Sequence, residues 1–248
     1  MITDLQEYVN LLLELNSSEI IFNSNKDPRF EVIRNLKADL LVIENPRKLK
    51  CLIINGDLIA SKLKKVSFKN CLYLEKIWLR NHEITDVEIS DCPNLKYVNF
   101  FDNKLCDISK LLSMLNPEIM ISIWLNKNNF DSSLDLFEKF TKVEELSLSE
   151  NQFRGSLEPL NKLRNLKVLV FRNTHINSGL EFLDMNLDQF FCGYDYNNDY
   201  GVFKLQEELK KYVKYDDDDH KHIMKDEVFE QKRLLHEWRI DFLNSQPN

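Results

Sequence analysis

The sequence of 248 residues is poor in the two residues that most often turn a chain, with only five glycines and six prolines. Sandwiches and barrels built from hairpins depend on these residues at their turns, so the shortage argues against both architectures. A long hydrophobic run is also lacking. The apolar stretch near the N-terminus is interrupted by Asn10 and Glu14 and is too short to span a bilayer. We therefore predict no membrane contact.

Positive charge is scarce as well. The chain has 33 Lys and Arg against 40 Asp and Glu, which gives a net charge of −7. No basic stripe is available to follow a phosphate backbone, so nucleic acid is excluded as an expected partner. The N-terminus lacks the basic region and the small-residue cleavage site of a signal peptide.

The cysteines show no C-x-x-C pair and are odd in number, which argues against a disulfide framework. They are Cys51, Cys71, Cys92, Cys106 and Cys192. Reduced, mostly buried thiols are typical of a cytoplasmic protein. We therefore predict a cytoplasmic location.

Motifs that carry catalysis are absent from the sequence. It contains no glycine-rich phosphate loop, no G-x-S-x-G, no H-E-x-x-H and no paired Cys/His ligand spacing. The acidic run 216–219, followed by His220 and His222, provides no fixed coordination geometry, so we predict no metal site there. His82 is interpreted as a structural histidine rather than a base. The sequence thus predicts no enzyme and no cofactor.

What the sequence does contain is an internal repeat. Eight apolar or polar-ladder positions between Val66 and Ile84 recur 21 residues later, between Val87 and Leu105. The unit inside this repeat is L-x-x-L-x-L-x-x-N-x-L, and it occurs in six tandem copies at residues 49–59, 74–84, 95–105, 120–130, 143–153 and 166–176. A degenerate last copy begins at residues 187–192.

This pattern resembles the leucine-rich-repeat family, over roughly residues 47–195. The stretches "SDCPNLKYVNF", "ENQFRGSLEPLNKLRNLKVL" and "NTHINSGLEFL" are similar in phrasing to fungal cytosolic-type leucine-rich-repeat proteins. The resemblance implies an α/β fold: a curved leucine-rich-repeat solenoid with a parallel concave sheet. The period-two stretches 64–71 and 85–92 predict short convex strands, and residues 106–118, 132–142 and 157–164 predict convex helices.

A polar ladder accompanies the leucines. Its positions are Asp57, His82, Asn103, Asn128, Asn151 and Thr174. A buried Asn has donors and an acceptor, so it can satisfy backbone groups of the adjacent turn where each strand bends away. Asp and Thr can do so in part.

Both ends of a solenoid need caps. We predict an N-terminal helical cap and degenerate first repeat at residues 1–46, the solenoid at 47–201, and a C-terminal cap or tail at 202–248. The helix expected at residues 3–16 begins at a Thr/Asp N-cap signal. For the C-terminal segment two interpretations stay open: a cap folded onto the last repeat, or a helix that binds a partner or dimerises.

The strand frame places positions 3, 5 and 7 of each repeat on the outward, concave face. Two of the three tryptophans of the chain occupy position 5, one repeat apart from each other. The predicted partner-binding patch is Trp78, Arg80, Tyr97, Asn99, Phe101, Trp124 and Asn126. Clustered Trp, Tyr and Arg are typical of protein-binding hot spots.

The expected function is a non-catalytic module that binds a protein or peptide on its concave face. Aromatic side chains on a sheet can instead simply pack across strands. Two other functions stay open: a structural protein that self-assembles through its C-terminal helix or a solenoid edge, and a substrate-recognition adaptor of a larger enzyme complex. Whether the chain is a monomer or a homodimer is not decided by the sequence.

Overall fold

The computed structural model describes residues 2–183, 187–192, 204, 205, 235 and 238. The chain forms two compact units, residues 1–130 and 131–248, and each is described by itself. The helices and strands of the first unit are α1 (Leu5–Glu14), β1 (Glu19–Phe22), α2 (Phe30–Ile33), β2 (Leu40–Glu44), β3 (Cys51–Asn55), η1 (Gly56–Leu58), β4 (Lys65–Lys69), β5 (Lys76–Arg80), β6 (Asp86–Ser90), β7 (Tyr97–Asn99), α3 (Ile108–Ser113) and β8 (Ser122–Trp124).

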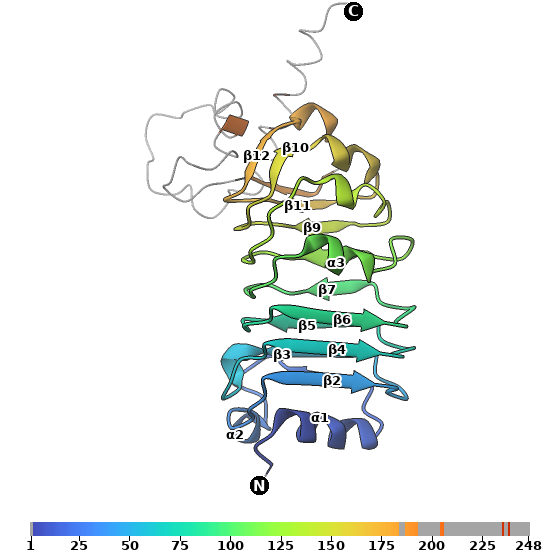
Figure 1. The fold of residues 1–248 in the computed structure, drawn as a ribbon, viewed down its shortest axis with the longest axis vertical. Helices are drawn as coiled ribbons and strands as arrows, with labels where there is room; N and C mark the ends of the chain where they lie inside the picture. The colour runs from blue at the N-terminus through green and yellow to red at the C-terminus, as the bar shows by residue number, and fades with distance from the viewer. Residues whose placement is uncertain (1, 184–186, 193–203, 206–234, 236–237, 239–248) are drawn as a thin grey trace, which may run out of the picture. The chain divides into compact units, whose positions relative to one another are not determined.

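The first unit is a leucine-rich-repeat solenoid with one parallel sheet on each side of the coil. We call the sheet β1-β3-β5-β7-β8 the long sheet, which is the sheet expected to be concave, and β2-β4-β6 the short sheet. Neighbouring strands pair in the register of the repeat, for example Ile77 with Val98 and Val98 with Ile123. Figure 1 shows β2, β4 and β6 stacked side by side, with β3 and β5 behind them. The predicted convex strands are confirmed as β4 and β6.

The leucine positions of each turn form the core between the two sheets. In the repeat of β5 these are Leu74, Ile77 and Leu79, all with 0% exposure. The equivalent positions in the other repeats are also buried, as the frame predicts. One turn alone cannot cover these side chains, and only stacking on its neighbours removes them from water.

The corners explain how the chain manages with few glycines. A left-handed residue stands at the end of each short-sheet strand, at Asn45, Asn70 and Asp91. Most of the ladder residues are likewise preceded by one, at Asn81, Asp102, Lys127, Glu150 and Asn173. Asn and Asp are the non-glycine residues that adopt this conformation most readily, so they supply most of the corners.

The polar ladder forms as predicted at several turns. Asn103 accepts a hydrogen bond from the Ile84 amide at 3.1 Å and donates to the carbonyl of Leu79 at 2.9 Å. Asn128 likewise accepts from the Leu105 amide at 3.0 Å and donates to the Phe100 carbonyl at 2.8 Å. Each side chain therefore joins its own turn to the preceding one.

Asp57 is not part of the ladder, and the prediction for this position was wrong. The chain enters the 3-10 helix η1 at Gly56 instead of a left-handed corner. As a result the Asp57 side chain is 58% exposed and accepts hydrogen bonds from Lys62 and Asn81, both at 2.6 Å.

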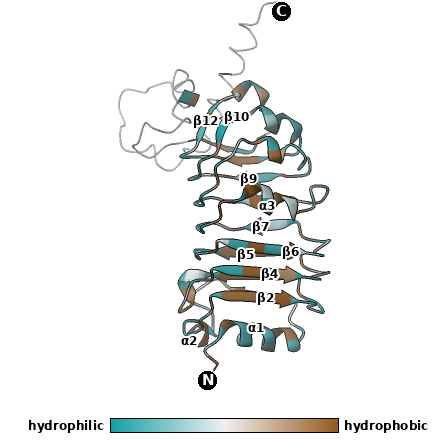
Figure 2. Cartoon of the chain, in the orientation of Figure 1, coloured by the Kyte–Doolittle hydropathy of each residue, from teal (hydrophilic) through white to brown (hydrophobic). Residues whose placement is uncertain are grey.

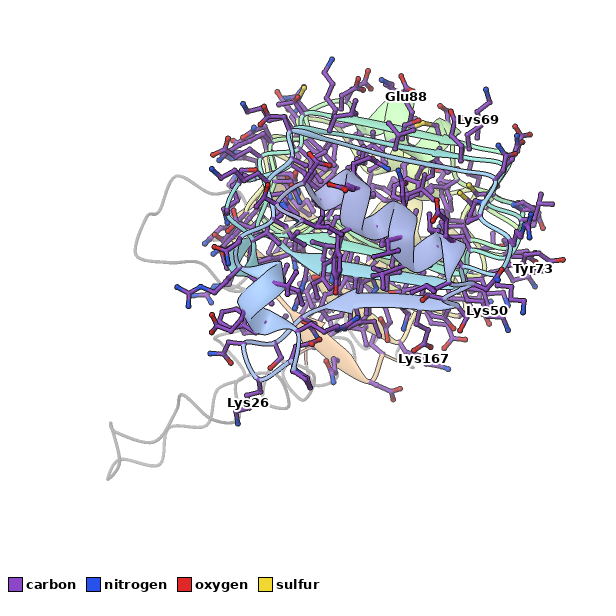
Figure 3. The ribbon with its side chains drawn as sticks, turned by 90° about the horizontal axis from the view of Figure 1, so that it is seen from below. Lys26, Lys50, Lys69, Tyr73, Glu88 and Lys167 are labelled. Atoms are coloured by element: carbon purple, nitrogen blue, oxygen red, sulfur yellow. The ribbon has the colours of Figure 1, made fainter. Side chains whose placement is uncertain are left out.

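The N-terminal end of the first unit is closed by side chains as well as by a helix. Helix α1 begins at the N-cap Asp4 and buries Leu5 and Val9. Figure 2 shows hydrophobic and hydrophilic residues side by side on it, and Figure 3 shows it lying across the end of the coil. The Gln6 amide both accepts from the Val42 amide and donates to the Val42 carbonyl, each at 2.7 Å, and so occupies the free edge of β2.

Arg29 protects the other exposed edge. Its guanidinium donates to the Ile21 carbonyl of β1 at 3.0 Å and is held by Asp27 at 2.8 Å. Unpaired edge strands are prone to pair with other chains. The first strand of each sheet therefore has backbone groups occupied by a side chain.

The second unit contains the later repeats, and its strands are three or four residues long. Its elements are η2 (Asp135–Phe137), β9 (Glu145–Ser147), β10 (Arg154–Ser156), η3 (Glu158–Lys162), β11 (Val168–Val170), β12 (His175–Ser178), η4 (Leu180–Phe182) and β13 (Gln189–Phe191). Strands β9, β11 and β13 form a parallel sheet, and β10 pairs with β12.

The predicted convex helices are confirmed in part. The helix expected at 106–118 is α3 of the first unit, whereas 132–142 and 157–164 of the second unit contain the 3-10 helices η2 and η3. The pair β10 and β12 was not predicted.

Most of the C-terminal segment 202–248, including the acidic run 216–219, lies outside the described residues. Leu205 and Leu235 are described as helical and buried. The boundaries 1–46, 47–201 and 202–248 stay predictions.

Candidate functional site

The seven residues of the predicted patch all lie in the first unit, on or just after three strands of the long sheet. Trp78 and Arg80 belong to β5, Tyr97 and Asn99 to β7, and Trp124 ends β8. Phe101 and Asn126 stand two residues beyond their strands. All of them except Asn99 are partly exposed, because they point away from the core. The strands thus bring the patch together on one face.

The two tryptophans lie in one row across three strands. Trp78 is paired with Asn99, and Asn99 is paired with Trp124. Adjacent strands are about 4.8 Å apart, so the two tryptophan backbones are separated by roughly 10 Å. One extended ligand segment is long enough to contact both rings.

Asn99 is buried, whereas its position in the strand frame predicted an outward, exposed side chain. It is only 3% exposed, and its Oδ1 accepts a hydrogen bond from the Phe101 amide at 2.9 Å. The side chain therefore turns back onto its own backbone between the two tryptophans. This hydrogen bond holds the backbone at Phe101 in place.

Lys76 is a member of the surface that was not included in the predicted patch. Its ammonium nitrogen lies 4.7 Å from the centre of the Trp78 ring and 5.2 Å from that of Tyr97. Lys127 lies in the same way over Phe101, at 5.4 Å. These are cation–π distances. The sequence signal for Lys76 was its position 3 in the same outward row of β5.

Arg80 is positioned by a residue far away in the sequence. Its Nη2 donates to Asn23 Oδ1 at 2.8 Å, and Asn23 immediately follows β1. The Arg80 Nε is buried, and none of the described residues forms a hydrogen bond with it. The contact with Asn23 depends on the sheet order β1-β3-β5, so no spacing in the sequence predicts it.

His82 is a structural residue, as predicted. It is 3% exposed, its Nδ1 accepts from the Leu63 amide at 3.3 Å, and its Nε2 lies 3.3 Å from the Ile54 carbonyl. A neutral ring with its proton on Nε2 satisfies both contacts. Burial lowers the pKa of His82 to about 4.

The cysteines are free thiols. Cys71 and Cys92 occupy equivalent positions after β4 and β6. A hydrogen bond shared with Cys92 and burial raise the pKa of Cys71, and the same hydrogen bond lowers that of Cys92. Among the residues that the structure describes, no group of His, Cys, Asp and Glu is arranged to hold a metal ion. No described helix combines the length and apolar composition needed to cross a bilayer.

No model of a known protein family matches the chain, and no curated protein matches it. Among solved structures, the chain is similar to the crystal structure of a TDR receptor, with 17% identity over 64% of this chain and 29% of that chain, at a TM-score of 0.41. It is also similar to the leucine-rich-repeat ectodomain of the plant membrane receptor kinase GASSHO1/SCHENGEN3 from Arabidopsis thaliana, in complex with CASPARIAN STRIP INTEGRITY FACTOR 2. That likeness has 16% identity over 59% of this chain and 28% of the other, at a TM-score of 0.30. The chain spans less than a third of either of those chains.

Proposed function

We propose that the chain is a non-catalytic interaction module that binds a protein or peptide on the outer face of the long sheet in its first unit. The observation that carries this proposal is the row Trp78–Asn99–Trp124 on three adjacent strands. Stacking of the repeats requires the buried residues on either side of each tryptophan, but it does not require the tryptophans.

The composition around this row supports binding. Tyr97, Phe101 and Arg80 flank the two tryptophans, and all three are partly exposed. Aromatic residues and Arg are enriched where proteins contact one another, and they carry most of the binding energy there. The alternative is that the rings only stabilise the sheet, which cross-strand pairs do by about 0.2–1 kcal/mol each.

Substituting both tryptophans separates these two interpretations. A peptide ligand is first selected from a random display library on the wild-type protein. The variant Trp78→Ala with Trp124→Ala should then lose at least about tenfold in affinity for it, since hot-spot truncations typically cost more than about 1 kcal/mol each. Its melting temperature should stay close to that of the wild type.

Tyr73 provides a matched control, because it is 53% exposed and lies outside the long sheet. Tyr73→Ala should leave both affinity and melting temperature unchanged. A large fall in melting temperature for the tryptophan variant, with affinity per folded molecule retained, would favour the packing role and refute the binding surface.

The cellular location, the likeness to fungal proteins and the adaptor role stay hypotheses. A cytoplasmic location is supported by the five free thiols, which persist in reducing compartments. The likeness to fungal cytosolic-type proteins rests on the phrases of the sequence alone. An adaptor role would use the same surface.

Self-assembly is the other candidate function. Pairing through the first strands is disfavoured, since Gln6 and Arg29 occupy backbone groups of β2 and β1. Light scattering of the chain with and without residues 203–248 tests whether that segment makes it a homodimer. A mass that halves on truncation would establish dimerisation through the segment.

A further inference from the structure

The outward side of strand β5 carries a cation, an aromatic ring and a second cation in alternation. These are Lys76, Trp78 and Arg80, at positions 3, 5 and 7 of the repeat. We propose that the ligand of this face is an extended acidic segment, with carboxylates on residues i and i+4 and a large apolar side chain on residue i+2. This inference rests on the proposed function and specifies the chemistry of its partner.

The charges of Lys76 and Arg80 are not neutralised within the part of the chain that the structure describes. Neither forms an ion pair with a described carboxylate, whereas Lys62, Lys64 and Lys110 of the same unit pair with Asp57, Asp39 and Asp86. The outward positions of β3, β5 and β7 also contain no Asp or Glu, and the outward carboxylate of the long sheet, Glu19 of β1, lies two strands away from Lys76. This face is therefore locally cationic on a chain whose net charge is −7, and complementary charge on the partner is expected.

Both cations are held in place before a ligand arrives. Lys76 is positioned over two rings, at 4.7 and 5.2 Å, and Arg80 is bonded to Asn23. Immobilising a long side chain on binding costs about 0.5–1.5 kcal/mol. Side chains that are already ordered avoid part of that cost, so a carboxylate gains more from them than from mobile lysines.

The spacing decides the pattern of the ligand. A strand rises about 3.3 Å per residue, so Lys76 and Arg80 are roughly 13 Å apart with Trp78 midway. In an extended peptide, residues i, i+2 and i+4 share one side and have the same spacing. An apolar side chain at i+2 thus meets Trp78 when the two carboxylates meet the two cations.

A second surface on the same unit has the same spacing of cations but lacks the aromatic ring, and carboxylates of β6 lie beside it. Strand β4 displays Lys65, Ser67 and Lys69, which repeat the cation spacing with serine in place of the ring. Figure 3 shows Lys69 pointing outward from the short sheet, and Glu88 of β6 is paired in register with Ser67. Lys65 is paired in register with Asp86 on β6. This strand is therefore the natural control for β5.

The test uses a fluorescent peptide, Gly-Glu-Ser-Phe-Ser-Glu-Gly, blocked at both ends, and fluorescence anisotropy with the full chain. Two control peptides have Gln for both Glu, or the same residues in the order Gly-Glu-Glu-Ser-Phe-Ser-Gly. The acidic peptide should bind at least about tenfold more tightly than either control, and its affinity should fall as salt is added.

Variants then locate the binding. Lys76→Gln with Arg80→Gln should weaken the acidic peptide about tenfold or more, on the basis of up to about fivefold for each exposed charge pair. Lys65→Gln with Lys69→Gln removes the same charge from β4 and should change the affinity by less than about twofold. Equal circular dichroism spectra verify that both variants fold.

Three results would overturn the proposal: no binding of the acidic peptide, binding unchanged by the β5 variant, or equal binding of a single-stranded oligonucleotide. Its failure is distinct from failure of the proposed function. If library peptides bind in a tryptophan-dependent way but have no acidic pattern, the binding surface stands and the acidic ligand is wrong.

Discussion

Two neighbouring turns of the first unit solve the same problem with different side chains. At the turn of Asn103, an amide bridges the Ile84 amide and the Leu79 carbonyl. At the turn of His82, an imidazole bridges the Leu63 amide and the Ile54 carbonyl. The four backbone groups are equivalent in the two turns. The ladder position therefore requires one acceptor and one donor in the right direction, and asparagine is only one way to supply them.

The imidazole ring of His82 is larger than an asparagine amide, and it needs space next to Gly56. A Cβ on Gly56 would lie 2.7 Å from His82 Nδ1 and 2.1 Å from the Asn81 carbonyl oxygen. The turn before His82 therefore needs a glycine at this point. Both ring nitrogens of His82 are engaged with backbone groups, so its place in the turn is explained without catalysis.

Removing the side-chain amide of Asn103 should lower the stability of the protein more than any other substitution considered below. Asn103→Ala leaves the Ile84 amide and the Leu79 carbonyl buried without a partner, and each such group costs about 1–3 kcal/mol. We expect the free energy of unfolding in urea to fall by about 3–4 kcal/mol. Lys104→Ala, at an exposed neighbouring position, should change it by less than about 0.5 kcal/mol. A similar loss for both variants would contradict the ladder role of Asn103.

Lowering the pH should weaken the turn of His82 but not the turn of Asn103, because only the histidine takes up a proton in this range. The His82 pKa is lowered from 6.5 to about 4 by burial, so the unfolded chain binds a proton that the folded chain excludes. The contribution of this group to stability is complete above pH 6.5, is lost as the pH falls toward 4, and then levels off. The maximum loss is about 3 kcal/mol.

His82→Asn supplies the Asn103 solution at the His82 turn and removes the titration. Unfolding measured from about pH 7 to pH 4 should therefore be less pH-dependent in this variant than in the wild type. Below this window the carboxylates with lowered pKa values, Asp27, Asp57 and Asp86, begin to lose their own stabilisation. Parallel pH profiles for the two proteins would show that His82 is not the titrating group.

Gly56→Ala should have a smaller effect, about 2 kcal/mol, since the added carbon meets a backbone oxygen that must shift. Gly155 differs from Gly56 because a Cβ added there would meet no other atom within 4 Å. Its φ is +92°, so an alanine at this position would be strained only by its backbone conformation. Gly155→Ala should lower the free energy of unfolding in urea by about 1 kcal/mol. If Gly56→Ala is tolerated better than Gly155→Ala, the close approach to Asn81 and His82 does not limit the turn.

Much of the architecture was predictable because stacked repeats impose a local pattern. The spacing of Leu74, Ile77 and Leu79 predicts both a strand and its buried face, and the structure confirms it. The ladder was predicted at His82 and Asn103 but was wrong at Asp57, because the sequence pattern does not reveal that the chain enters a 3-10 helix at Gly56. Strands β10 and β12 were missed for a similar reason, since such short strands carry too little alternation to be recognised.

The outward surface was predictable only in part. Strand alternation placed Trp78, Tyr97 and Trp124 on one face, but it predicted an exposed Asn99, whose side chain is buried and accepts a hydrogen bond from the Phe101 amide. Lys76 was in the correct row, yet its contact with two rings depends on side-chain geometry across strands. The bond between Arg80 and Asn23 joins residues 57 positions apart.

The repeat, the buried leucine face and the outward direction of the tryptophans can all be derived from the sequence, because they follow from local spacing that every turn must share to be stacked. The side chains that complete a turn or the surface emerge only from the folded chain: Gly56 against His82, Gln6 at the edge of β2 and Asn23 against Arg80. Such contacts depend on the order in which strands lie side by side and on the space left between turns, and neither is encoded within a single repeat.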